Sequence, residues 1–191
     1  VAVARGDVPL ALGTDTAGSG RIPAGFNHIV GLKPTPGRVS TAGVVPACRS
    51  IDCVSVFALT VDDAAQALAV MEGVDAADPY SRFEPGPATL PARVRIGVPT
   101  VLPDDMDPGY AAAFEAAVAQ ARELGAELVE IDFTPLHEVA ALLYAGPWVA
   151  ERYTVLGPLL QDNPEEVDPA VRAVVSGATA YSAADAFQAQ Y

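Results

Sequence analysis

The clearest pattern of apolar and polar positions lies in the middle of the chain, where strand-like and helix-like segments alternate. Residues 95–99 form a short, mostly apolar run, and apolar residues alternate with acidic ones over residues 129–133; both patterns are typical of β-strands. Between them, Asp107 and Pro108 form a typical helix start, and apolar residues recur every three or four positions until Gly125. This order predicts a βαβ unit with two parallel strands.

The N-terminal part of the chain has a less regular pattern. Residues 8–12 predict a short buried strand, and residues 23–31 predict one or two helical turns that end at Gly31. Thr60 and Asp63 resemble a capping box, and apolar residues recur at helical spacing after them. A helix is therefore expected to start at this point.

Prolines and glycines divide the C-terminal half. Residues 75–93 contain four prolines and predict an extended surface connection. From residue 135 onward the pattern is helical, with breaks expected at Gly146, at Gly157 with Pro158, and at Gly177. The expected helices cover residues 135–145, 147–156, 165–175 and 182–191. Together these elements predict an α/β chain without internal repeats.

Composition and charge narrow the class of protein. The chain has 191 residues, of which 51% are hydrophobic, and is long enough for one domain with a core. The formal net charge is −13, which disfavours nucleic acid and anionic membranes as partners, because both need clustered Lys and Arg. The sequence has no long apolar run and no secretory signal pattern, so a cytoplasmic protein is the default expectation.

Two cysteines and two histidines offer few ligands for a metal. Cys48 and Cys53 do not have the spacing of a common zinc site, and no metal is expected. The cysteines could form a Cys–His nucleophile pair, but two reduced, partly buried thiols are the commoner arrangement in a cytosolic protein. His28 and His137 are expected to be structural or surface residues.

The main candidate for chemistry is the stretch GTDTAGSGRIPAG, residues 13–25, with Ser19 at its centre. Its glycines let the backbone bend tightly and approach a ligand, and its small side chains leave backbone N–H groups uncovered. Asp15 and Arg21 can pair across the loop and fix its shape, and Pro23 can begin a helix. An exposed hydroxyl among backbone donors suits a nucleophile with an oxyanion hole, and it also suits an anion-binding loop.

Short motifs do not resolve this choice. The phosphate-binding P-loop needs a lysine where Ser19 stands, and the hydrolase elbow G-x-S-x-G needs glycines where Ala17 and Arg21 stand. A Ser–His–Asp triad could use His28 as the base and Asp15 as its orienting acid, and this is the weaker candidate.

The same stretch is similar to the core of the amidase signature family. GTDTAGSGRIPAG, followed by GLKPTPGRVS, matches a pattern close to G-[ST]-D-x-[GA]-G-S-x-R-x-P-[AS], and STAGVVPACRSIDCVSVFALTVDDA resembles the allophanate hydrolase branch more than other amidases. The resemblance implies that Ser19 is the acylated nucleophile. It also implies that the backbone N–H groups of Thr16, Ala17, Gly18 and Ser19 form the oxyanion hole.

The resemblance further implies that the base of the reaction is missing from this chain. The family uses a Ser–cis-Ser–Lys triad, in which a neutral lysine activates the nucleophile through a bridging serine, and both partners would lie upstream of Val1. Lys33 belongs to a G-[LF]-K-P-[ST] segment that is structural in the family. We therefore expect residues 1–191 to be part of a single amidase-signature catalytic domain, truncated at both ends and nearly inactive by itself.

A second candidate segment is GPWVAERY, residues 146–153. One helix would place Tyr144, Trp148 and Arg152 on the same face, each four residues apart. From spacing alone, the simpler interpretation has two aromatic core residues, with Arg152 paired to a surface glutamate at position 138 or 151. The segment resembles the substrate-binding segment of the allophanate hydrolase branch, which implies that Tyr144 and Arg152 hold a substrate carboxylate.

The sequence thus predicts an amidase-signature fold with a mixed β-sheet flanked by helices. The expected function is a serine amidohydrolase that converts allophanate to ammonia and carbon dioxide through an acyl intermediate on Ser19, with no cofactor or metal. The expected partners are a small amide substrate and a fused or separate urea carboxylase, and a homodimer is one option. The alternatives are another amidase of the family, including the amidase component of an aminoacyl-tRNA amidotransferase, and a non-catalytic anion-binding module that uses the Gly13–Ser19 loop.

Overall fold

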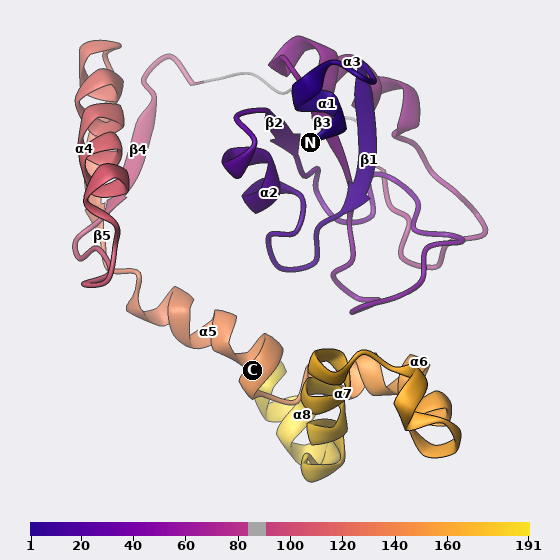
Figure 1. Cartoon of the computed structure of the whole chain (residues 1–191). Coiled ribbons are helices and arrows are strands. Elements are labelled where there is room, and N and C mark those ends of the chain that lie inside the picture. Colours follow the sequence, from indigo (N-terminus) through magenta and orange to yellow (C-terminus); the bar gives the residue numbers. More distant parts are fainter. Residues whose placement is uncertain (84–90) are drawn as a thin grey trace. The chain divides into compact units, whose positions relative to one another are not determined.

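The computed structural model describes residues 1–83 and 91–191. They divide into two compact units, one built from Val1–Pro85 with Leu142–Tyr191 and the other from Gly86–Ala141. Figure 1 colours the chain along its sequence and labels the elements of both units. No helix in the described part of the chain is long and apolar enough to cross a membrane.

The first unit contains an antiparallel sheet and most of the helices. In chain order its elements are α1 (Ala2–Arg5), β1 (Leu10–Thr14), α2 (Arg21–Phe26), β2 (Val30–Leu32), β3 (Val54–Ala58), α3 (Val61–Met71), α6 (Val149–Asp162), η1 (Pro164–Glu166), α7 (Pro169–Ser176), η2 (Gly177–Ala180) and α8 (Ala183–Gln190). β3 lies between β1 and β2, so that Leu12 and Leu32 both pair with Val56.

One helix covers part of this sheet and forms the local core with it. α3 packs against β2 and β3, and Val56, Ala58 and Ala64 are fully buried between them. α3 begins as predicted, because the side chain of Thr60 accepts a hydrogen bond from the N–H of Asp63 at 3.1 Å. Pairing with β3 therefore connects β1, and the loop that follows it, to a packed layer.

Two predictions for the N-terminal part are wrong. The strand expected at residues 8–12 begins two residues later, and Leu10 and Leu12 are 40% and 55% exposed rather than buried; β1 is an edge strand of this sheet, and α3 packs against the other two. Gly31 does not end a helix but pairs with Phe57 inside the sheet. A Cβ at position 31 would lie 2.7 Å from the carbonyl oxygen of Gly20, so the glycine is required by close packing.

The C-terminal helices differ from prediction at one break. α6 continues through Gly157 and Pro158, where an end was expected. A proline inside a helix removes one hydrogen bond and crowds the preceding turn, but α6 also packs against α7 and η2, and this packing stabilises the helix despite the proline. The break expected at Gly177 is confirmed, since α7 ends at Ser176.

The second unit is the predicted βαβ arrangement. Its elements are β4 (Arg95–Pro99), α4 (Pro108–Glu123) and β5 (Glu127–Ile131), and α5 (Thr134–Ala145) leads out of it. β4 and β5 are parallel, with Arg95 opposite Glu127, and Asp107 caps α4 by accepting from the N–H of Gly109 at 2.7 Å. The prediction of a mixed α/β fold is confirmed, with the antiparallel and parallel strands in two separate sheets.

Part of one prediction cannot be compared with the structure. The extended connection predicted for residues 75–93 includes Pro85 and Pro87, which lie outside the described residues. Within the described part, Asp78 accepts hydrogen bonds from the backbone N–H groups of Thr41 and Tyr80, at 2.7 and 2.9 Å. This start of the connection is therefore held against the first unit.

Candidate active site

Ser19 lies in the short loop that joins β1 to α2, and its side chain is exposed. The residue before it, Gly18, has φ of +124°, a conformation that side-chain-bearing residues rarely adopt. A Cβ at position 18 would also lie 2.7 Å from the Cδ1 atom of Ile22. The sequence of the loop therefore fixes a sharp backbone turn next to an exposed hydroxyl.

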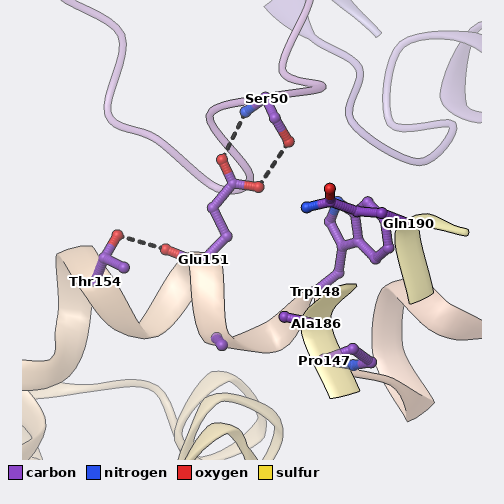
Figure 2. Close-up of a pocket in the computed structure, with 8 residues that line it drawn as sticks. Ser50, Pro147, Trp148, Glu151, Thr154, Ala186 and Gln190 are labelled. Carbon is purple, nitrogen blue, oxygen red and sulfur yellow. Dashed lines mark hydrogen bonds between the residues drawn. The ribbon is translucent and has the colours of Figure 1, made fainter. Parts of the chain in front are cut away.

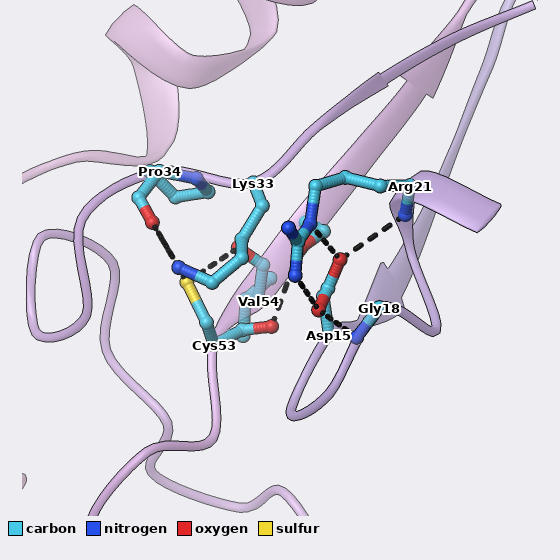
Figure 3. Close-up of polar contacts among 8 residues, drawn as sticks. Asp15, Gly18, Arg21, Lys33, Pro34, Cys53 and Val54 are labelled. Carbon is cyan, nitrogen blue, oxygen red and sulfur yellow. Dashed lines mark hydrogen bonds and ion pairs between the residues drawn. The ribbon is translucent and has the colours of Figure 1, made fainter. Parts of the chain in front are cut away.

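The predicted pair of Asp15 and Arg21 forms at this turn, between a buried acid and an exposed arginine. The carboxylate of Asp15 is fully buried and accepts from Arg21 Nε at 2.9 Å and from Arg21 Nη2 at 3.1 Å (Figure 3). It also accepts from the backbone N–H groups of Gly18 and Arg21, at 2.7 and 3.1 Å. The Arg21 guanidinium, followed by these backbone donors, lowers the pKa of Asp15 from 3.8 to about 2. Asp15 is therefore an ionised structural anchor, with all four donor groups on Gly18 and Arg21.

The oxyanion-hole prediction needs one change. Gly18 was expected to act alongside its neighbours, but its N–H points at the Asp15 carboxylate and is already used. The N–H groups of Thr16, Ala17 and Ser19 have no acceptor among the described residues. Three of the four predicted donors are thus available to a ligand, and the fourth shapes the loop.

The start of α2 also differs slightly from prediction. The helix begins at Arg21, and Pro23 is its third residue rather than its first. The proline still falls in the first turn, where backbone N–H groups have no partner within the helix.

A second buried acid, which the sequence analysis missed, ties the Ser19 loop to residues 47–52. Asp52 is 6% exposed. Its Oδ1 atom accepts from Thr16 Oγ1 at 2.5 Å, and its two oxygens accept from the N–H groups of Ala47 and Cys48 at 2.9 to 3.1 Å. The only sequence signal is an acidic residue between two cysteines in a mostly apolar stretch, since burial next to the Ser19 loop depends on the fold.

Both cysteines are buried free thiols, which confirms the structural interpretation. Cys48 Sγ donates to Glu151 Oε2 at 3.0 Å. Burial and then the neighbouring Glu151 carboxylate raise the pKa of Cys48 to about 12. Burial also raises the pKa of Cys53. Because only the thiolate is an effective nucleophile, a Cys–His reaction centre has no support here.

Thiol reactivity gives a direct check of this assignment. In the folded full-length protein, wild type and Cys48→Ser should expose the same number of reactive thiols to a disulfide reagent. After unfolding in guanidinium chloride, the variant should show one thiol fewer. A native protein that loses a fast-reacting thiol on this substitution would contradict the burial of Cys48.

Two other candidate bases, Lys33 and His28, lack the partners that a reaction at Ser19 would need. Lys33 Nζ donates to the carbonyl of Pro34 at 3.0 Å, beside the Cys53 thiol (Figure 3). His28 follows α2 with φ of +52°, and Asp15, its proposed orienting acid, is bound to Arg21 instead. The Ser–His–Asp alternative therefore lacks its acid.

Tyr144 and Arg152 come together, although the single helix considered for them is interrupted at the break expected at Gly146. α5 ends at Ala145 and α6 begins at Val149, with Gly146 at the break between them. The guanidinium carbon of Arg152 nevertheless lies 4.6 Å from the centroid of the Tyr144 ring, a distance typical of a cation–π contact. The arginine reaches the tyrosine across a bend between two helices.

Arg152 has no acidic partner within ion-pair distance in the described parts of the chain. The surface-pair interpretation with Glu151 is not what the structure shows, because Glu151 binds Ser50 instead. Trp148 lines a cavity of about 360 Å³ together with Ser50, Glu151 and Gln190 (Figure 2). Arg152 thus has no carboxylate partner among the described residues.

The comparisons with known proteins agree with this geometry. The family model described as Amidase matches residues 1–183, and the chain belongs to the amidase family. It is 46% identical to the urea amidolyase of Saccharomyces cerevisiae over 99% of its own length and 11% of that protein. It is also 40% identical to the indoleacetamide hydrolase of Pseudomonas syringae pv. syringae, over 72% of this chain and 29% of that protein.

A solved structure covers the whole chain. The allophanate hydrolase of Kluyveromyces lactis superimposes on all of it with a TM-score of 0.94 and 46% sequence identity, while the chain covers 32% of that structure. The predicted family and its resemblance to allophanate hydrolase are therefore confirmed. The chain spans about a third of that structure and about a tenth of the urea amidolyase.

Proposed function

We propose that this chain carries the nucleophile and the substrate-carboxylate site of an allophanate hydrolase. The observation that carries the proposal is Arg152, a cation held over Tyr144 without an acidic partner among the described residues. Allophanate is an amide with a carboxylate at its other end, and in a chain of net charge −13 such an anion needs a local cation. The similarity to allophanate hydrolase and urea amidolyase supports the same substrate.

In the proposed reaction, Ser19 Oγ attacks the amide carbonyl of allophanate. The free N–H groups of Thr16, Ala17 and Ser19 would stabilise the negative charge that develops on the carbonyl oxygen. The carbon–nitrogen bond then breaks, ammonia leaves with the proton taken from Ser19, and water hydrolyses the acyl-serine. The base that moves this proton, a lysine acting through a bridging serine, is proposed to come from the part of the protein outside this chain.

The proposal treats residues 1–191 as one part of a single catalytic domain. Two coverages support this: the allophanate hydrolase structure matches 100% of this chain, while this chain covers only 32% of that structure. A urea carboxylase, fused or separate, is the proposed source of the substrate, and the longer urea amidolyase relative supports a fused arrangement. The cytoplasmic setting stays a prediction from the sequence.

A second candidate is an amidase of this family that acts on another amide. The similarity to an indoleacetamide hydrolase favours it, because that match covers 72% of this chain at 40% identity. Such an enzyme would use the same nucleophile and would not need Arg152 for a carboxylate. The two candidates therefore differ in what the arginine does.

Arg152→Ala tests this difference in the full-length protein. With allophanate, kcat/KM should fall about 10- to 100-fold, because a hydrogen bond to a charged group is typically worth about 1.5 to 3 kcal/mol. Biuret, in which a neutral amide replaces the carboxylate, should be handled nearly as before. Arg152→Lys should recover little, since lysine lacks the planar two-pronged donor. Ammonia release measures the activity of both variants with allophanate and with biuret.

Arg122, an exposed arginine on α4, provides the matched control. Arg122→Ala should leave both substrates unaffected. An equal fall for allophanate and biuret on Arg152→Ala, or no fall for either, would favour the second candidate. Sulfate or phosphate binding at the Ser19 loop without any amide hydrolysis would favour the anion-binding module.

A further inference from the structure

We propose that Glu151 is a positioning residue, which holds Arg152 at a fixed place relative to the Ser19 loop and thereby selects substrates with a carboxylate. The inference rests on the proposed function, since it concerns how the same site recognises allophanate. Glu151 does not touch the reacting atoms in this proposal. It acts through the backbone of the residue that follows it.

The carboxylate of Glu151 accepts three hydrogen bonds from a distant segment of the chain. Its Oε1 atom accepts from the N–H of Ser50 at 2.7 Å, and its Oε2 atom accepts from Ser50 Oγ at 2.7 Å (Figure 2). Oε2 also accepts from Cys48 Sγ at 3.0 Å. The raised pKa of Cys48 keeps this thiol protonated, and therefore a donor, at neutral pH. One carboxylate thus binds two residues that are about a hundred positions away.

The place of Glu151 on α6 makes it a suitable anchor for Arg152. Both residues lie in the first turn of the helix. Successive residues of a helix point about 100° apart, so Glu151 reaches the segment 47–52 while Arg152 lies over Tyr144. Fixing the glutamate side chain fixes the rotation of this turn, and with it the direction from which the arginine side chain leaves the helix.

The other end of the connection is the Ser19 loop. Cys48 donates through its backbone N–H to Asp52, at 3.0 and 3.1 Å, and Asp52 accepts from the side chain of Thr16. A continuous series of hydrogen bonds therefore runs from the Ser19 loop through Asp52 and Cys48 to Glu151. It links the nucleophile segment to the cation segment, although nothing in the sequence places them close together.

This link suits a substrate with two ends. In allophanate the attacked carbonyl and the carboxylate are separated by one nitrogen, so the carboxylate reaches its cation only at one spacing. A displacement of about 1 Å can lower the rate of a reaction about 100-fold. Loosening Glu151 should therefore penalise a substrate bound at both ends far more than one bound at the amide alone.

The test compares Glu151→Ala, Glu151→Gln and Ser50→Ala in the full-length protein. Glu151→Ala should raise KM for allophanate about 10- to 100-fold with a smaller change in kcat, and should leave the KM or Ki of biuret nearly unchanged. Glu151→Gln should restore much of the allophanate affinity, because its carbonyl oxygen still accepts from Ser50. Glu165→Ala, at an exposed glutamate of η1, is the matched control and should match wild type.

A double-mutant cycle separates positioning from simple stabilisation. In an Arg152→Ala background, Glu151→Ala should cause no further rise in the allophanate KM, because the cation that it positions is already gone. Additive effects of the two substitutions would overturn the inference, as would equal losses for allophanate and biuret. If Glu151→Ala does not fold, Ser50→Ala decides, since it removes one hydroxyl and should raise the allophanate KM alone.

The outcomes also separate this inference from the proposed function. Wild-type protein that releases no ammonia from allophanate would overturn both. Wild-type protein that hydrolyses allophanate and depends on Arg152, but shows no substrate-selective effect of Glu151 or Ser50, would overturn the positioning role alone.

Discussion

Ser19→Ala is expected to abolish amide hydrolysis by the full-length protein. Removing the nucleophile of a catalytic unit typically lowers kcat by about 10⁴-fold or more. The loop should keep its shape, because Asp15, Gly18 and Arg21 form its internal hydrogen bonds without the Ser19 side chain. Ammonia release from allophanate measures the rate, and mass spectrometry of the quenched wild-type reaction should find the acyl group on the Ser19 peptide.

Ser176 offers a matched control for this substitution, since it is another exposed serine outside the candidate site. Ser176→Ala should retain full activity. Persistent hydrolysis by Ser19→Ala, with the melting temperature unchanged, would assign the nucleophile elsewhere. Loss of activity together with a large fall in melting temperature would contradict the claim that Ser19 is not needed for the loop.

The sequence was sufficient for features that depend on neighbouring residues. The parallel βαβ unit follows from strand and helix periods with a cap at Asp107. Its first strand and its helix lie where the pattern predicts them, and its second strand, Glu127–Ile131, begins two residues before the predicted 129–133. The pairing of Asp15 with Arg21 is also local, because six residues of a glycine-rich loop bring the two side chains together. Local spacing carries such information directly.

Contacts between distant segments could not be predicted in this way. Asp52 and Glu151 have no motif of their own, and their partners lie up to 103 positions away. The proximity of Arg152 and Tyr144 was anticipated from helical spacing, but the single helix assumed for it is interrupted at Gly146. The burial of β1 was overestimated because edge position in a sheet depends on which strands pair, and a five-residue pattern does not determine this.

The other large effect is expected from Asp15→Ala, which should destabilise the full-length protein and disable the Ser19 loop together. The substitution removes a fully buried carboxylate with four hydrogen bonds, and loss of hydrogen bonds to a charged group costs about 1.5 to 3 kcal/mol. The Gly18 turn then loses its anchor, so kcat should also fall by about 100-fold. Denaturant unfolding and ammonia release measure the two effects. Asp7→Ala breaks the exposed Arg5–Asp7 pair and should change neither.

The pH dependence of this effect distinguishes a charged anchor from a merely polar one. Since the folded-state pKa of Asp15 is lowered from 3.8 to about 2, its ionised form adds stability above pH 4, and this contribution is lost as the pH falls through about 2. The stability difference between wild type and Asp15→Asn should therefore be constant from pH 7 to pH 5 and shrink towards pH 2. If the stability difference between wild type and Asp15→Asn does not change between pH 7 and pH 2, the charge of Asp15 adds no stability. The carboxylate would then contribute through hydrogen-bond geometry alone.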